Sequence, residues 1–274
     1  MYRGGVLARC AAFTLVGAAA LAFAGGASAA PTGTVMRVGP NRINPMDPFG
    51  KVNNDTVTSS NWSGYAVQDA SKFTDVRGSW VQPAVTCHSS TAQYAAFWAG
   101  IDGYSSDSVE QLGTDSDCLS NNTASYYAWW EMYPANSVEL STSTYPVKAG
   151  DRLYADVSVS GTSFTLTLES SEGWTFTTTK TGSGLAQSSA ELIAESPEIC
   201  GVTCKLAQLS DFGTVKFSAA QAAVNGGADA PFSTYTADSG PHDIIAETSN
   251  GTVRAQPTSL SANGKAFNIA WKHD

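Results

Sequence analysis

Apolar and polar residues alternate along most of the chain after about residue 59, which is the period expected of β-strands. Residues 151–160, 163–169 and 174–180 show the pattern most clearly, with apolar side chains at every second position. Between the last two segments, Ser170 to Gly173 predicts a hairpin turn. The pattern therefore indicates a protein built mainly from short antiparallel strands.

Helical periodicity is weak throughout. The best helical candidate runs from Ser218 to Ala223, where a serine that can cap a helix precedes good helix formers. No fixed repeat is present, and many short strands in one domain of about 220 residues are typical of a two-sheet sandwich. We predict an all-β protein, a β-sandwich of two antiparallel sheets.

Three segments carry polar and aromatic residues where a packed strand would carry small apolar ones. A period of two puts each group on one strand face. The groups are Trp98, Gly100 and Asp102; Tyr127, Trp129, Glu131 and Tyr133; and Glu191, Ile193 and Glu195. If these strands are neighbours, one sheet face collects aromatic and carboxyl side chains and resembles a substrate groove, although ordinary packing of aromatic residues and solvation of glutamates explain the pattern too.

The N-terminal segment has the features of an export signal. Arg3 and Arg9 precede an apolar run from Ala11 to Ala24, and Ala27-Ser28-Ala29 suits signal cleavage. We expect residues 1–29 to be a signal peptide, residues 30–58 a leader or pro-segment, and residues 59–274 the folded domain. The mature protein is expected to be secreted and extracellular, and not to enter a membrane, because no later apolar run reaches the roughly 20 residues of a spanning helix.

Charge and cysteine content narrow the classes of partner. Because the first 55 residues hold five of the 15 Lys and Arg and two of the 24 Asp and Glu, the remainder carries −12, which argues against nucleic acid as a partner. Four cysteines remain after the signal, which allow three disulfide connectivities. We favour Cys87 with Cys118 and Cys200 with Cys204, because the second pair spans a tight loop. A zinc site is the competing interpretation, but His88 lacks ligand-like spacing to other residues.

Several catalytic chemistries have no support in the sequence. The three histidines accompany no G-x-S-x-G elbow, and H-E-x-x-H, a phosphate-binding glycine loop and a dinucleotide fingerprint are all missing. What remains is carboxylate chemistry, on either glycosidic or peptide bonds.

Six ordered motifs resemble those of the glutamic peptidases (eqolisins), and they cover nearly all of the chain after Thr58. The motifs are Ser59-Ser60-Asn61-Trp62-Ser63-Gly64, Phe97-Trp98-Ala99-Gly100-Ile101-Asp102-Gly103, Glu110-Gln111-Leu112-Gly113-Thr114-Asp115, Tyr127-Ala128-Trp129-Trp130-Glu131-Met132-Tyr133-Pro134, Ala190-Glu191-Leu192-Ile193-Ala194-Glu195 and Asp211-Phe212-Gly213-Thr214-Val215. Six motifs in one order are far more specific than any single motif, and we expect a bacterial member.

The resemblance implies a concanavalin-like β-sandwich and an acid endopeptidase that hydrolyses polypeptides without cofactor or metal, here expected as a monomer. It assigns the catalytic pair to Gln111 and to Glu195, the second glutamate of the A-E-x-I-x-E pattern. The positions that match residues lining or supporting the family's cleft are Trp98, Asp102, Asp115, Trp129 and Glu131. Asp102 and Asp115 are expected to hold Gln111 and neighbouring loops.

The chain departs from fungal members at three places near the expected site. The segment from Asp102 to Gln111 is one residue shorter, Leu192 stands where they carry Trp, and Ser196-Pro197 follows Glu195 where they carry Asp-Phe. These differences are expected to affect substrate preference more than the reaction.

Two other functions fit the same sequence. Concanavalin-like sandwiches also bind glycans, and the aromatic strand around Trp129 could stack on sugars. A glycosidase that uses Glu131 and Glu195 would need their carboxyl groups roughly 5 to 10 Å apart across a sugar.

Overall fold

The structure is a computed structural model that describes residues 56–200, 203–237, 240–247 and 250–274, together with the backbone of residues 35–37. The signal peptide expected at residues 1–29 and most of the leader expected at residues 30–58 lie outside the described residues. Nearly every element is a β-strand, and the described part of the chain contains one short 3₁₀ helix, η1 (Phe232–Thr234). No helix among the described residues is long and apolar enough to cross a membrane.

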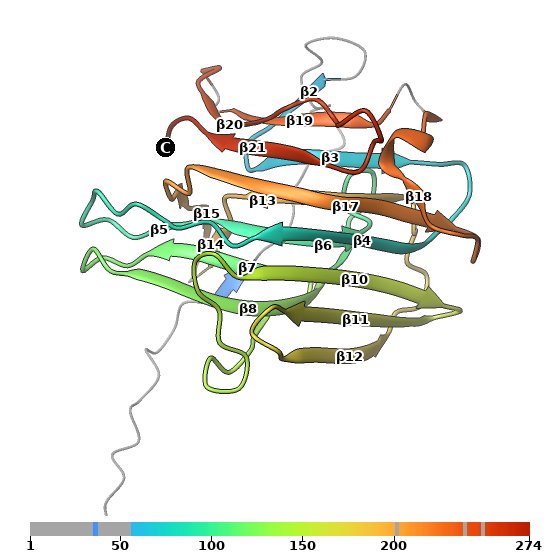
Figure 1. The fold of residues 1–274 in the computed structure, drawn as a ribbon, viewed down its shortest axis with the longest axis horizontal. Helices are drawn as coiled ribbons and strands as arrows, with labels where there is room; N and C mark the ends of the chain where they lie inside the picture. The colour runs from blue at the N-terminus through green and yellow to red at the C-terminus, as the bar shows by residue number, and fades with distance from the viewer. Residues whose placement is uncertain (1–34, 38–55, 201–202, 238–239, 248–249) are drawn as a thin grey trace, which may run out of the picture. The chain divides into compact units, whose positions relative to one another are not determined.

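Two large, mostly antiparallel sheets form the body (Figure 1). The first sheet follows the strand order β8, β7, β6, β13, β3 and β19. Its strands are β8 (Ala124–Tyr133), β7 (Val109–Cys118), β6 (Ala96–Ile101), β13 (Ser189–Glu195), β3 (Trp62–Gln68) and β19 (His242–Glu247). This order places the three motif-bearing segments on β6, β8 and β13 of one sheet.

The second sheet follows the order β12, β11, β10, β4, β17, β21 and β20. Its strands are β12 (Thr175–Thr181), β11 (Ser163–Ser170), β10 (Arg152–Ser160), β4 (Phe73–Val81), β17 (Thr214–Val224), β21 (Phe267–Trp271) and β20 (Val253–Pro257). Strand β19 pairs with β3 in its first half and with β20 in its second half, so it links the two sheets.

Short strands complete the pairing at the sheet edges. They are β2 (Thr56–Ser59), β5 (Gln93–Tyr94), β9 (Val138–Glu139), β16 (Gln208–Leu209) and β18 (Ala230–Pro231). A separate three-stranded sheet contains β1 (Val35–Arg37), β14 (Glu198–Cys200) and β15 (Cys204–Leu206). Strand β1 belongs to the predicted leader and pairs antiparallel with β14, which begins three residues after Glu195.

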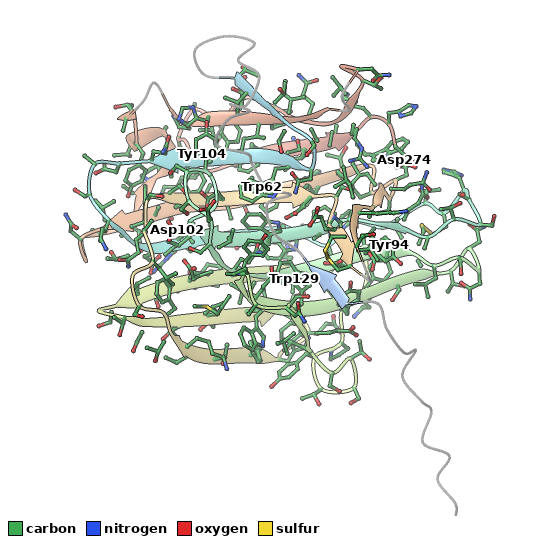
Figure 2. All side chains as sticks on the ribbon, turned by 180° about the vertical axis from the view of Figure 1, so that it is seen from behind. Trp62, Tyr94, Asp102, Tyr104, Trp129 and Asp274 are labelled. Carbon is green, nitrogen blue, oxygen red and sulfur yellow. A yellow bond between two sulfur atoms is a disulfide. The ribbon has the colours of Figure 1, made fainter. Side chains whose placement is uncertain are left out.

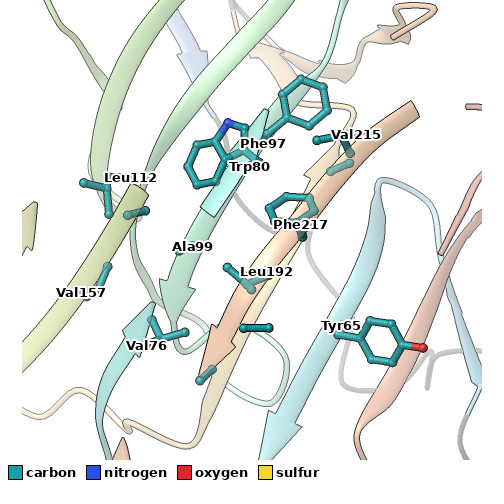
Figure 3. Close-up of a cluster of buried hydrophobic side chains, with 14 of the residues drawn as sticks. Tyr65, Val76, Trp80, Phe97, Ala99, Leu112, Val157, Leu192, Val215 and Phe217 are labelled. Carbon is teal, nitrogen blue, oxygen red and sulfur yellow. The ribbon is translucent and has the colours of Figure 1, made fainter. Parts of the chain in front are cut away.

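The hydrophobic core lies between the two sheets and draws on both (Figure 3). Trp80 and Phe217 from the second sheet pack there with Phe97, Leu112 and Leu192 from the first, and all five are at most 2% exposed. Large aromatic side chains bury much apolar area each, and such burial is the dominant favourable term in folding. The core therefore holds one face of the first sheet rigidly and leaves its other face for the polar residues.

The predicted strands at residues 151–160, 163–169 and 174–180 are confirmed as β10, β11 and β12, and the turn between the last two contains Gly173 at φ 91°. The helix predicted at Ser218 to Ala223 is wrong, because these residues lie within β17. There they pair with β4, and Ala219 at φ 54° accompanies a bulge in that pairing. Tertiary pairing overrides the modest helix propensity of a short alanine-rich segment.

Both favoured disulfides are present, Cys87 with Cys118 and Cys200 with Cys204. The first joins the segment after β4 to the end of β7. The second closes the β14–β15 hairpin, where Cys200 and Cys204 are directly paired.

Candidate active site

The face of the first sheet that points away from the core carries polar and aromatic side chains, among them Trp62 and Trp129, which Figure 2 labels. We call it the site face. Across β7, β6 and β13, Gln111 pairs with Gly100, and Gly100 pairs with Glu191. Glu195 lies four residues after Glu191, and therefore on the same face of β13, and it pairs with Ala96. The three segments that carry the period-two pattern therefore lie in one sheet, where β6 and β13 are adjacent and β7 separates β8 from β6.

Aromatic rings surround the polar groups on the site face. Trp62 and Trp98 pack edge to face with ring centroids 4.9 Å apart, and both are fully buried. They form one cluster with Trp129 and Ile193, separate from the core between the sheets. Such rings exclude water, so hydrogen bonds and charges among them are stronger than in solvent.

Glu195 receives a hydrogen bond at each carboxyl oxygen. Asn61 Nδ2 donates to Oε1 at 2.9 Å, and Trp98 Nε1 donates to Oε2 at 2.8 Å. Burial raises the pKa of Glu195 well above its usual value, the bond from Trp98 lowers it, and the nearby Glu131 carboxyl raises it. Two fixed donors orient the carboxyl and offset part of the cost of its charge in an apolar setting.

Gln111 is held by a neighbouring carboxyl. Its Nε2 donates to Glu131 Oε2 at 2.7 Å, and the two residues are directly opposite in the β7–β8 pairing. Gly100 lies beside Gln111 on β6, where an added Cβ would stand 3.1 Å from Gln111 Cβ and 3.0 Å from the Trp98 ring. A glycine at this position leaves room for the Gln111 side chain above the sheet.

Asp115 holds two aromatic side chains. It accepts hydrogen bonds from Trp129 Nε1 at 2.6 Å and from Tyr127 Oη at 3.0 Å. Burial raises the pKa of Asp115 to about 7, while these two bonds act in the opposite direction. Asp115 therefore fixes the rings at this end of the site face.

Asp102 lies at the end of β6 with φ 72°, a conformation that Asp tolerates better than most residues. Its carboxyl accepts hydrogen bonds from the backbone N–H of Gln187 and of Ser188, both at 2.8 Å. These bonds fasten the segment that leads into β13. Asp102 thus fixes a neighbouring segment, and Glu131 is the carboxyl that receives the Gln111 amide.

A second group of carboxyls lies near Asp102. Glu110 and Glu191 are fully buried. Burial raises the pKa of Glu110 to about 9, and the charge of Asp102 contributes in the same direction. Burial also raises the pKa of Glu191 well above its usual value, and Asp102 and Glu110 raise it further. Burial therefore favours the neutral form of both glutamates.

One described group of side chains has the composition of a metal site. Potential ligand atoms of Glu198, Cys200 and Cys204 lie within 4.8 Å of one another. Both cysteines are joined in a disulfide, so neither supplies the thiolate that a metal ion requires.

The structure places six of the seven predicted site residues on the site face and Asp102 at its margin. The six are Trp98, Gln111, Asp115, Trp129, Glu131 and Glu195. Sequence reasoning assigned no role to two contributors, Asn61 and Trp62. The motif Ser59 to Gly64 contained both, but nothing in the sequence showed that it would meet β13.

Comparisons with known proteins agree with this geometry. A family model described as the peptidase A4 family matches residues 60–271. The chain is 31% identical over 197 residues to aspergillopepsin-2 of Aspergillus niger, which covers 63% of this chain and 67% of that protein.

Two solved structures share the fold. A crystal structure of scytalido-glutamic peptidase with a peptide-based transition state analog matches with a TM-score of 0.64 at 25% identity, over 78% of this chain and 98% of that one. The crystal structure of aspergilloglutamic peptidase from Aspergillus niger matches with a TM-score of 0.54 at 28% identity, over 66% of this chain and 99% of that one. The chain therefore belongs to the peptidase A4 family and is a glutamic endopeptidase.

Proposed function

We propose that this endopeptidase is exported and acts in acid with Glu195 as general base and acid and Gln111 as the oxyanion donor. The Glu195 carboxylate takes a proton from a water molecule as the water oxygen bonds to the scissile carbonyl carbon. The Gln111 amide N–H donates to the oxygen that becomes negative. The protonated Glu195 then returns its proton to the leaving amine as the C–N bond breaks, so no external reagent is consumed.

The observation that carries this proposal is the pair of N–H donors on Glu195. Asn61 and Trp98 bind the two carboxyl oxygens inside a cluster of buried rings. A carboxylate that accepts hydrogen bonds is easier to ionise than a bare one in the same burial. A base must first accept a proton and later return it. It therefore needs a pKa that burial raises and that hydrogen-bond donors lower.

Gln111 suits the second role because an amide does not titrate. Its Nε2 carries two hydrogens, and the bond to Glu131 fixes the plane in which the other one points. Preorganised donors of this kind stabilise the negative oxygen without reorganising during the reaction. Glu131 then acts through Gln111 by fixing its orientation.

Access to the pair requires a change from the state described. Gln111 and Glu195 are both 0% exposed, so a polypeptide cannot reach them as they stand. Strand β1 of the leader pairs with β14, close to Glu195 in the chain. We therefore propose that residues 30–58 contain a pro-segment that is removed before activity.

The test is digestion of a denatured protein at acidic pH by the exported, processed enzyme. We expect cleavage that a pepstatin-type inhibitor leaves unchanged, because the mechanism uses no pair of aspartates. Glu195→Ala should lower kcat by about 10⁴-fold, and Gln111→Ala by about 10²- to 10³-fold. Both variants must first show the thermal transition of the wild type.

Absence of cleavage by the correctly processed wild type across acidic pH would contradict the proposal and favour a glycan-binding protein. Full activity of either folded variant would remove that residue from the mechanism while leaving the family assignment in place.

A further inference from the structure

Asn61 makes a direct contact with the proposed base, although the chemistry above assigns it no role of its own. Its side chain is 2% exposed, and its Nδ2 lies 2.9 Å from Glu195 Oε1. The two residues are 134 positions apart in the sequence. A buried donor at this distance from a buried carboxyl contributes more than an exposed one would.

The direction of the Asn61 amide is fixed by its other end. Ser59 Oγ donates to Asn61 Oδ1 at 3.1 Å, which leaves the nitrogen facing Glu195. The same hydroxyl oxygen accepts the backbone N–H of Trp62 at 3.1 Å, so Ser59 is itself held in place. The hydroxyl of Ser59 therefore selects the amide orientation that presents an N–H to the carboxyl.

The backbones that carry the two residues are fastened together. Ser196 N donates to Asn61 O at 2.9 Å, directly after Glu195 in the chain. Arg254, which is 4% exposed, donates to Ser60 O at 3.2 Å and to Ser196 Oγ at 3.3 Å. These contacts hold the turn before β3 against the end of β13, so the donor and its acceptor cannot drift apart.

We propose that Asn61, oriented by Ser59, is the positioning residue that keeps the Glu195 carboxylate aimed and ionisable in acid. The inference rests on the proposed role of Glu195 as the base. It adds that Asn61, on the turn between β2 and β3, helps to set the lowest pH at which the enzyme is active. This turn must therefore remain in the mature enzyme.

The charges around Glu195 make a neutral donor the suitable partner. Glu131 from β8 raises the pKa of Glu195, and Asp115 from β7 lies on the same face two strands away. Arg254 from β20 contacts the neighbouring Ser196. An amide donates at every acidic pH, whereas a further carboxyl would add repulsion once ionised.

The decisive experiment is the pH profile of kcat/KM for the processed wild type and for Asn61→Leu, which keeps the approximate volume but removes the donor. At low pH, kcat/KM falls as the base becomes protonated, and we call this part of the profile the acid limb. We expect the acid limb to move to higher pH by about one unit, because a lost hydrogen bond to the charged form raises a carboxyl pKa. Activity should therefore fall about tenfold below the limb and change little above it, with KM unaltered.

An Asn61→Leu profile of unchanged shape, whether at full activity or scaled down equally at every pH, would overturn the inference. Ser59→Ala, which leaves the amide in place but unoriented, should move the limb in the same direction by less, and an unmoved limb there would count against it. Asn121→Leu, in the exposed turn between β7 and β8, is the control and should leave the profile unchanged.

N-terminal sequencing of the processed enzyme gives an independent result that does not depend on any variant. The inference requires a start at or before Ser59, and a fully active enzyme that begins after Asn61 would overturn it. An inactive wild type would instead contradict the proposed dyad, so the two failures are distinguishable.

Discussion

Glu195 and Glu191 are four residues apart on one face of β13, and both are fully buried, yet their surroundings differ. Glu195 receives an N–H donor at each oxygen, from Asn61 and Trp98. Neither oxygen of Glu191 has a partner at full hydrogen-bond geometry, although the Ser189 side chain and the Tyr104 backbone lie close enough to lower its pKa. Its neighbours include the carboxyls of Asp102 and Glu110, which raise its pKa further.

The difference shows that residue type and strand face do not decide which glutamate can act as a base. Burial disfavours the charged form of both, and only the placement of donors or of other carboxyls separates them. The donors at the Glu195 end of β13 favour the charged carboxylate, whereas the carboxyls of Asp102 and Glu110 at the other, carboxyl-rich end disfavour it. One strand thereby carries two buried glutamates in different surroundings, of which Glu195 is the proposed base.

The largest expected effect comes from exchanging the two glutamates separately for glutamine. Glu195→Gln should lower kcat by about 10⁴-fold, because the amide cannot accept the proton of water. Glu191→Gln should stay within a few-fold of wild type in acid, since an amide resembles the protonated carboxyl that it replaces. Steady-state kinetics of both folded variants check this, and equal losses in the two would break the comparison.

A second effect concerns stability and pH at the carboxyl-rich end. The pKa of Glu110 is about 9 in the folded protein against about 4.5 unfolded, so between those values the folded chain keeps a proton that the unfolded chain has released. The contribution of Glu110 to the free energy of unfolding is therefore fully present below about pH 4.5. It is lost as pH rises toward 9, by at most about 1.4 kcal/mol per pH unit.

Replacing Glu110 by Gln removes the part of the pH dependence of stability that comes from this carboxyl. We expect Glu110→Gln to match wild type in thermal unfolding near pH 4 and to exceed it at pH 8. Glu169→Gln, on the exposed side of β11, is the control and should follow wild type at both values. Parallel loss of stability in wild type and Glu110→Gln would show that this carboxyl is not held neutral.

The smallest effect is expected at Asp102, which fixes the entry to β13. Asp102→Asn keeps the shape and tolerates the positive φ, but one oxygen becomes a donor that faces a backbone N–H. We expect a loss of about 1–3 kcal/mol in the free energy of unfolding, the cost of a buried group without its partner. Urea unfolding in acid measures it, and an unchanged midpoint would show that these bonds add nothing.

Most of the strands, and the side chains that share each strand face, could be predicted from the sequence alone, because the period of two is a local property of backbone geometry. The segments around Trp98, Trp129 and Glu191 had the right faces before any neighbour was known. The Ser218 to Ala223 segment shows the limit of this reasoning. Local preference there favoured a helix, and pairing of β17 with β4 made it a strand.

The sequence by itself determined the all-β class, the family and the positions of Gln111 and Glu195 within its motifs, and it favoured the disulfide pairing that the structure shows. Only the tertiary structure decided that β6 lies between β7 and β13, that Glu131 holds Gln111, and that Asn61 reaches Glu195. The physical reason is that burial and hydrogen bonding depend on which distant segments meet in space. A pKa and a catalytic role follow from those neighbours, which no local pattern records.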